Sequence, residues 1–170
     1  MDPHQLRKRI RFLLLFFIVG LILSGVTAFP LVWEAGVLDR MLGTDSRFVP
    51  DLPDLARWIT RVHHGLVETD ARYPFILYGT DWLAFAHIVI AIAFWGPLKD
   101  PVKNIWVIEF GMIACGLVIP LALICGPVRG IPPFWRLIDC SFGVFGAIPL
   151  MLCKRWVRQL EGESIRATQI

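Results

Sequence analysis

The sequence predicts an all-α, polytopic membrane protein: a four-helix bundle of four transmembrane helices, with an extracytoplasmic amphipathic helix between spans 1 and 2. Hydrophobic residues make up 56% of the 170 positions, whereas soluble domains typically hold about 45–50%. The apolar residues gather in four long runs that short charged segments separate. A hydrocarbon core about 30 Å thick needs about 20 apolar residues in a helix, and each run is close to that length. We therefore expect residues 1–170 to form a single integral membrane domain.

The first expected span covers residues 12–30 and follows a basic segment. Arg7, Lys8, Arg9 and Arg11 lie just before it. Because basic residues are enriched in cytoplasmic segments, we expect the N-terminus in the cytoplasm. A basic start before an apolar run is also typical of a signal peptide, but this run is longer than the usual apolar region of one. The sequence therefore favours a retained span.

Residues 31–73 form the one long loop, which we expect to be an extracytoplasmic cap. The stretch LVWEAGVLDRML after Pro30 predicts a short helix, and Asp51 or Asp54 can cap a second helix. The apolar stripe of that second helix, at helical spacing, consists of Leu55, Trp58, Ile59, Val62 and Leu66. Its polar side holds Arg57, Arg61, His64 and Glu68. This pattern is typical of a helix that lies flat on the bundle or in the membrane interface.

The remaining spans are expected at residues 74–97, 104–126 and 134–153. Lys99 and Lys103 lie in the short loop between the second and third spans, and the C-terminal tail is basic at its start. Both segments are therefore expected in the cytoplasm. The charge pattern predicts a membrane protein with both termini cytoplasmic.

Ionisable side chains interrupt the apolar runs. An ionisable group in hydrocarbon costs at least about 2.5 kcal/mol, so we expect these residues to be buried polar residues that face other helices. His87 lies near the midplane of its span, and Glu109 lies alone near the inner surface, at 1.5 Å of rise per residue. His87 is either a packing residue that hydrogen-bonds to another helix, a haem or metal ligand, or a member of a proton relay from Asp81 to Glu109.

The outer third of the bundle is expected to hold a ligand-binding cluster. Depth along the helices places Asp81, Arg136 and Asp139 at this level, and His63 can close over them from the cap. Carboxylates and a histidine suit a divalent metal, while an arginine suits an anionic or quinone-like ligand. The alternative is a local ion pair between Arg136 and Asp139, three residues apart, that anchors the helix. Small residues on the Asp139 side, which let another helix approach closely, are Gly143 and Gly146.

Other cofactors and catalytic motifs receive little support. His87 is the only histidine inside a span, so a haem with two histidine ligands lacks a second one at the same depth. His63 and His64 are adjacent and point about 100° apart, so they do not form a metal pair. The sequence contains no P-loop, GxSxG or HExxH motif, and no basic stripe that would predict nucleic-acid binding.

The four cysteines are expected to be packing residues. None belongs to a CxxC pair, and all lie within the spans or at their ends. Four-span membrane oxidoreductases that generate disulfides need reactive cysteines in their outer loops. Here the outer loops contain none, which disfavours that activity; the four positions are Cys115, Cys125, Cys140 and Cys153.

Three stretches from Tyr78 to Cys140, the last of which continues to Gly143, carry a resemblance: YGTDWLAFAH, VKNIWVIEFG and RGIPPFWRLIDCSFG. Over this part, a little over a third of the chain, the sequence resembles small bacterial four-span inner-membrane proteins to which no activity is assigned. The resemblance implies the bacterial inner (plasma) membrane as the location, and it implies no catalytic residue.

The combined pattern predicts a binding or accessory role in the lipid bilayer, as a homo-oligomer or as a subunit of a membrane complex. One alternative is an oligomeric transporter or channel coupled to ions or protons. Another is a membrane enzyme or cofactor-binding protein whose polar site opens to the periplasm. The sequence leaves the cofactor and any metal open.

Overall fold

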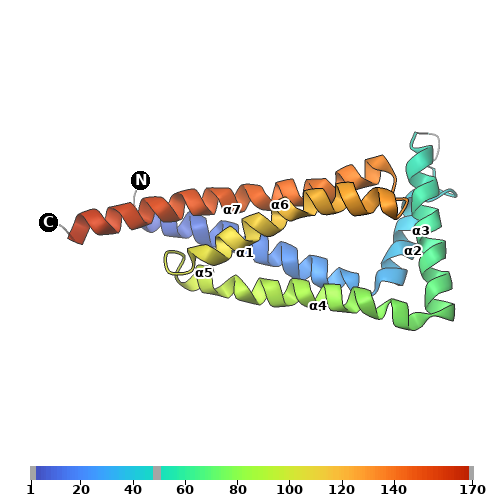
Figure 1. The fold of residues 1–170 in the computed structure, drawn as a ribbon, viewed down its shortest axis with the longest axis horizontal. Coiled ribbons are helices and arrows are strands. Elements are labelled where there is room, and N and C mark those ends of the chain that lie inside the picture. The colour runs from blue at the N-terminus through green and yellow to red at the C-terminus, as the bar shows by residue number, and fades with distance from the viewer. Residues whose placement is uncertain (1–2, 48–50, 169–170) are drawn as a thin grey trace. The chain divides into compact units, whose positions relative to one another are not determined.

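The computed structural model describes residues 3–47 and 51–168, with side chains described as far as residue 162, and these residues are helical almost throughout (Figure 1). Within these ranges there is no β-strand. The elements in chain order are α1 (Pro3–Ala28), α2 (Leu31–Leu42), α3 (Pro53–Arg72), the short 3-10 helix η1 (Pro74–Ile76), α4 (Tyr78–Ala93), α5 (Trp95–Lys99), α6 (Ile105–Val128) and α7 (Pro133–Thr168).

Four helical segments are long and apolar enough to cross a membrane, which confirms the predicted all-helical class and the number of candidate spans. They are Pro3–Ala28, Pro74–Lys99, Ile105–Val128 and Pro133–Gly162. The first and the fourth of these segments extend beyond the apolar runs, because the first begins at Pro3 and the fourth continues to Gly162. The basic and polar residues at these ends, chiefly Arg, Lys, Gln and Glu, are good helix formers, so nothing in the sequence stops either helix at the edge of its apolar run.

The second candidate span is interrupted near its end. Helix α4 ends at Ala93, and α5 begins at Trp95. Pro97 has no backbone N–H, so it cannot donate the helical hydrogen bond to the carbonyl of Ala93. The helix is therefore interrupted, and the chain continues as the short helix α5, in which Pro97 is buried.

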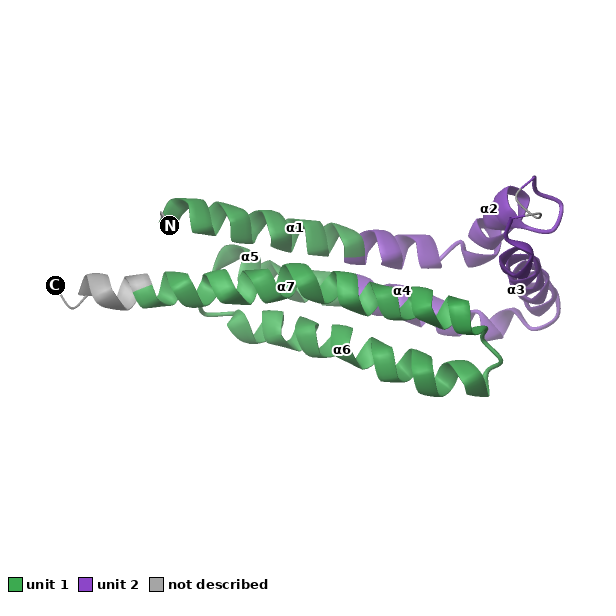
Figure 2. Ribbon diagram, turned by 90° about the horizontal axis from the view of Figure 1, so that it is seen from above, with its two compact units in different colours: residues 1–20, 90–170 green, residues 21–89 purple. Residues whose placement is uncertain are grey.

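The chain divides into two compact units (Figure 2). Unit 1 consists of the described parts of residues 1–20 and 90–170, and unit 2 consists of residues 21–89. In unit 1, α1 and α7 each carry buried, largely aliphatic residues spaced three or four apart, and Cys153 Sγ of α7 lies 3.8 Å from the carbonyl oxygen of Ile10 of α1. Those with 5% exposure or less are Leu6, Ile10 and Leu14 on α1 and Leu150, Cys153, Val157 and Leu160 on α7. This spacing places them on one face of each helix.

Glycines set the close helix contacts of unit 1. A Cβ at Gly111 would lie 2.6 Å from the ring of Phe94, and one at Gly143 would lie 2.5 Å from the carbonyl oxygen of Cys115. A Cβ at Gly146 would lie 2.9 Å from Cys115 Sγ. The predicted close approach of another helix to the Gly143 side of α7 is therefore confirmed.

In unit 2, the amphipathic pattern of α3 is also confirmed. Ala56 and Ile59 are buried, and the polar side of the helix is exposed. The predicted aspartate cap is wrong, because Leu52 occupies the N-cap position and makes no capping hydrogen bond. Helix α3 instead begins with Pro53, whose fixed φ suits the first turn, and Asp54 pairs with Arg57.

The prediction of buried polar residues is wrong for the part of the chain that the structure describes. No polar or charged residue there is fully buried. Asp81, His87, Glu109 and Asp139 are each half-buried. The physical reason is that only 11–22% of each candidate span is buried inside the protein, so these helices offer few enclosed positions.

Candidate functional site

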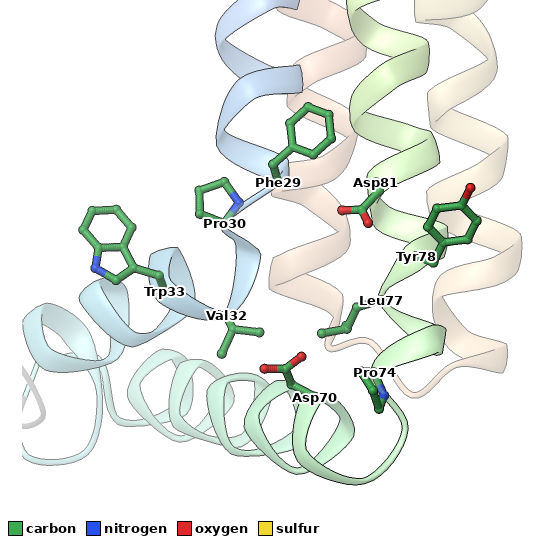
Figure 3. A pocket seen from close by; sticks show the side chains of 9 residues that line it. All are labelled: Phe29, Pro30, Val32, Trp33, Asp70, Pro74, Leu77, Tyr78 and Asp81. Atoms are coloured by element: carbon green, nitrogen blue, oxygen red, sulfur yellow. The ribbon is translucent and has the colours of Figure 1, made fainter.

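An open pocket of about 510 Å³ lies in unit 2, where the elements of the cap meet α4 (Figure 3). The end of α1, the start of α2, the end of α3 and the start of α4 each contribute to it. Its lining residues are Phe29, Pro30, Val32, Trp33, Asp70, Pro74, Leu77, Tyr78 and Asp81.

Two carboxylates supply the charge of this pocket. Asp81 is half-buried in the first turn of α4, and Asp70 is exposed near the end of α3. Figure 3 shows both carboxylates directed toward the space between the helices. Among the described residues, neither carboxylate has a hydrogen-bond or ion-pair partner. Two acidic groups without protein partners favour a positively charged ligand.

The rest of the lining is mostly apolar. Leu77 lies between the two carboxylates, and Val32 lies beside Asp70 (Figure 3). Phe29 lies beside Asp81. The rings of Trp33 and Tyr78 lie at the edges of the pocket and are 68% and 59% exposed. Aromatic faces attract cations, and apolar side chains favour aliphatic groups. The lining therefore suits a cation that carries an apolar part.

A second polar cluster joins α2 to α3. His63 Nδ1 donates a hydrogen bond to Asp39 Oδ2 at 2.8 Å, and Thr60 Oγ1 donates to Asp39 Oδ1 at 2.5 Å. The backbone N–H of Thr44 donates to Thr60 Oγ1 at 3.0 Å. Gly36 makes room for the histidine ring, since a Cβ there would lie 3.1 Å from His63 Nε2.

Asp39 is held in its ionised form by this cluster. Burial raises the pKa of its carboxyl, but the hydrogen bonds from Thr60 and His63 and the charges of His63 and His64 outweigh burial. The net effect lowers the pKa below the ordinary value of 3.8. The sequence placed His63 over Asp81 or Asp139, and the structure gives it Asp39 as a partner instead. A ligand-binding role for His63 stays a prediction.

His87 also has a partner other than the expected one. Its Nδ1–H donates to the carbonyl oxygen of Leu83, one turn earlier on the same helix, at 2.8 Å. The Cβ of His87 lies close to α1, because a Cβ at Gly25 would lie 3.2 Å from it and 2.8 Å from the carbonyl oxygen of Ala84. Gly25 therefore sets the contact between the end of α1 and α4 within unit 2.

Arg136 and Asp139 do not form the local ion pair that their spacing allowed, as far as the described residues show. The aliphatic part of Arg136 packs against Gly126, and its Nε is buried with no hydrogen-bond partner in the structure. Both residues belong to unit 1, whereas Asp81 belongs to unit 2. The predicted meeting of the three side chains stays a prediction.

Glu109 is not alone, which corrects the prediction. Lys154 Nζ lies 2.8 Å from Glu109 Oε1, and Arg158 Nη2 lies 4.0 Å from the same oxygen. All three residues belong to unit 1. The signal was present in the sequence, because Glu109 near the start of one span and Lys154 at the end of the next lie at similar depth when the two helices run antiparallel.

Asp70 and Asp39 were not predicted as site residues. Asp70 follows no apolar pattern and lies among other charged residues near the end of α3, so only its neighbours in the fold distinguish it.

Among the described residues, no group of three His, Cys, Asp or Glu side chains could hold a metal ion. Comparisons of the chain with protein-family models, with curated proteins and with solved structures found no significant match.

Proposed function

We propose that this chain is an integral membrane binding protein whose pocket at Asp70 and Asp81 takes a small organic cation with an apolar part. The observation that carries the proposal is the pair of carboxylates in one open, largely apolar pocket, neither with a partner in the part of the chain that the structure describes. An ionised carboxylate near the membrane interface is costly unless a counter-charge or water compensates it. A cationic ligand would supply that counter-charge.

The proposal includes an orientation in a bacterial inner membrane, with both chain termini in the cytoplasm. It is supported by the basic residues before the first apolar run, in the loop after α5 and at the start of the C-terminal tail. The cap of residues 31–73 and the pocket then face outward. A cation would reach the pocket without crossing the hydrocarbon core.

Binding by the purified protein tests this proposal. Isothermal titration in detergent would compare an alkylammonium ion, such as butyltrimethylammonium, with a neutral compound of the same shape. We expect the cation alone to bind, and D81N and D70N each to weaken it by about tenfold, because each variant removes one attractive charge. If the neutral compound binds equally well, the proposal is wrong.

Two variants serve as matched controls. D45N removes the same charge from an exposed residue of the cap that does not line the pocket. H64A changes an exposed residue on the polar side of α3. Both should bind the cation as the unaltered protein does. Equal weakening by D45N and D81N would mean that the total charge of the protein, and not the pocket, attracts the ligand.

The other roles that the sequence allowed have less support from the structure. A proton relay through Asp81, His87 and Glu109 loses support because Glu109 pairs with Lys154 and His87 bonds to its own helix. Two carboxylates can also carry acid–base chemistry, so a membrane enzyme stays an alternative to this proposal. An accessory role as a homo-oligomer or as a complex subunit is compatible with ligand binding.

A further inference from the structure

A groove of about 590 Å³ lies between α1 and α7 in unit 1, at the basic end of both helices. It is independent of the acidic pocket, which belongs to unit 2. The lining residues are Gln5, Lys8, Arg9, Phe12 and Leu13 of α1 and Trp156 of α7. The five residues of α1 lie on one face of the helix because they are spaced three or four apart.

The lining changes character along the helix. Gln5, Lys8 and Arg9 supply polar and positively charged groups, and Phe12 and Leu13 follow within the next turn. Phe12 is 69% exposed and marks the start of the apolar run. The groove therefore offers cationic donors at one end and an apolar surface at the other, about 6 Å apart at 1.5 Å of rise per residue.

The cations of this groove are available to a ligand. Arg9 lies over the ring of Trp156, with 5.9 Å between the guanidinium carbon and the ring centroid. Within the described residues, neither Lys8 nor Arg9 has an acidic partner. The nearby cations of α7 differ in this respect, because Lys154 and Arg158 face Glu109.

We propose that this groove binds an anionic phospholipid. Lys8, Arg9 and Gln5 would hold the phosphate of the headgroup, and the first part of an acyl chain would lie along Phe12 and Leu13. Guanidinium and ammonium groups bind phosphate strongly. Basic pockets between transmembrane helices at the cytoplasmic surface are a recognised form of lipid-headgroup site.

The apolar half of the groove selects a lipid over a free anion. Inorganic phosphate would use only the polar end and would leave Phe12 without a partner. Trp156 fits the same occupant, because tryptophan favours the interface between headgroups and hydrocarbon. A phospholipid satisfies both ends at once.

Native mass spectrometry of the detergent-purified full chain tests the proposal. The protein would be titrated with phosphatidylglycerol and, separately, with phosphatidylcholine of the same acyl chains. We expect tighter binding of phosphatidylglycerol, and a loss of about thirtyfold in its affinity in the double variant K8Q/R9Q. Equal affinity for the two lipids would overturn the proposal.

The matched control is the double variant R7Q/R11Q. It removes two charges from the same turns of α1, at exposed residues that do not line the groove. We expect it to lose less than about threefold in affinity. Equal losses in the two double variants would show that the basic end attracts anionic lipid without a defined site, and this would contradict the proposal.

The variant F12A tests the apolar half. Because the Phe12 side chain is largely exposed, its removal should leave the fold intact, which a thermal melt would verify. We expect weaker binding of phosphatidylglycerol with its preference over phosphatidylcholine retained, and no displacement of the lipid by an excess of inorganic phosphate. Unchanged lipid affinity in F12A, or displacement by phosphate, would overturn the assignment of a lipid.

Discussion

His63 Nδ1 lies 2.8 Å from Asp39 Oδ2, and this hydrogen bond joins the two helices of the cap across 24 positions of sequence. The two side chains are 24% and 19% exposed, so water reaches them only in part. Partial exclusion of water makes the bond stronger than a fully exposed one. The shape of the cap, and with it the position of Asp70 in the pocket, depends on this contact between α2 and α3.

We therefore expect D39N to loosen the cap. The variant replaces the ionised acceptor of two hydrogen bonds with a neutral amide, at a cost of about 1 kcal/mol. Hydrogen exchange measured by mass spectrometry should show faster exchange across residues 31–72 and little change in α6. D45N, which changes an exposed aspartate nearby, should exchange as the unaltered protein does.

The stability of the cap should also fall in acid. Because the pKa of Asp39 is lower in the folded chain than its ordinary value of 3.8, folding favours the ionised carboxylate. This contribution is complete above the ordinary pKa and is lost as the pH falls through the lower, folded pKa. Thermal melts of the detergent-purified protein should show it as a loss below about pH 4. The loss should be smaller in D39N, and an equal loss in both proteins would contradict the role of Asp39.

The contrast between α3 and the Asp39 cluster shows which features of the cap can be predicted from the sequence. The apolar stripe of α3 repeats at helical spacing, so one helix suffices to predict which side is buried. The bond between Asp39 and His63 depends on how two helices pair, and no local pattern encodes that pairing. Helical spacing pointed to Asp81 or Asp139 as the partner of His63, and it could not identify Asp39.

The contact at Gly25 gives a sharper test of packing. In G25A the new methyl group would lie 2.8 Å from the carbonyl oxygen of Ala84, so we expect a loss of about 1–3 kcal/mol. In G20A, on the same helix, nothing lies within 4 Å of the new methyl group. That variant should be neutral or slightly more stable, because alanine favours the helix. Unfolding in detergent mixtures would measure both, and equal stabilities of the two variants would contradict the contact.

The ion pair of Glu109 and Lys154 is expected to couple α6 to α7. Glu109 is 40% exposed and Lys154 is 25% exposed, so the pair contributes about 1 kcal/mol. A double-mutant cycle of E109Q and K154Q, measured by unfolding, should give a coupling energy of that size. Additive effects of the two substitutions would mean that the pair contributes nothing to stability.

This pair also marks a limit of arguments from depth alone. The rise per residue predicts Glu109 near the inner end of its span. The charge pattern predicts the basic start of the C-terminal tail on the same, cytoplasmic side of the membrane. Depth alone does not show that α6 and α7 pack side by side. Gly143 and Gly146 of α7 allow this close contact with α6. Asp81 shows the opposite case, because the sequence predicted it as a ligand-binding residue, whereas it did not single out Asp70, which lines the same pocket.

The orientation of the cap decides whether a ligand can reach the pocket from outside the cell. Labelling with a membrane-impermeant maleimide in intact cells tests it directly, using R57C and R155C in a chain whose four cysteines are replaced by alanine. Arg57 and Arg155 are both exposed, one on α3 and the other at the basic end of α7. We predict that R57C is labelled in intact cells and R155C only after permeabilisation. Labelling of R57C only after permeabilisation would contradict the account.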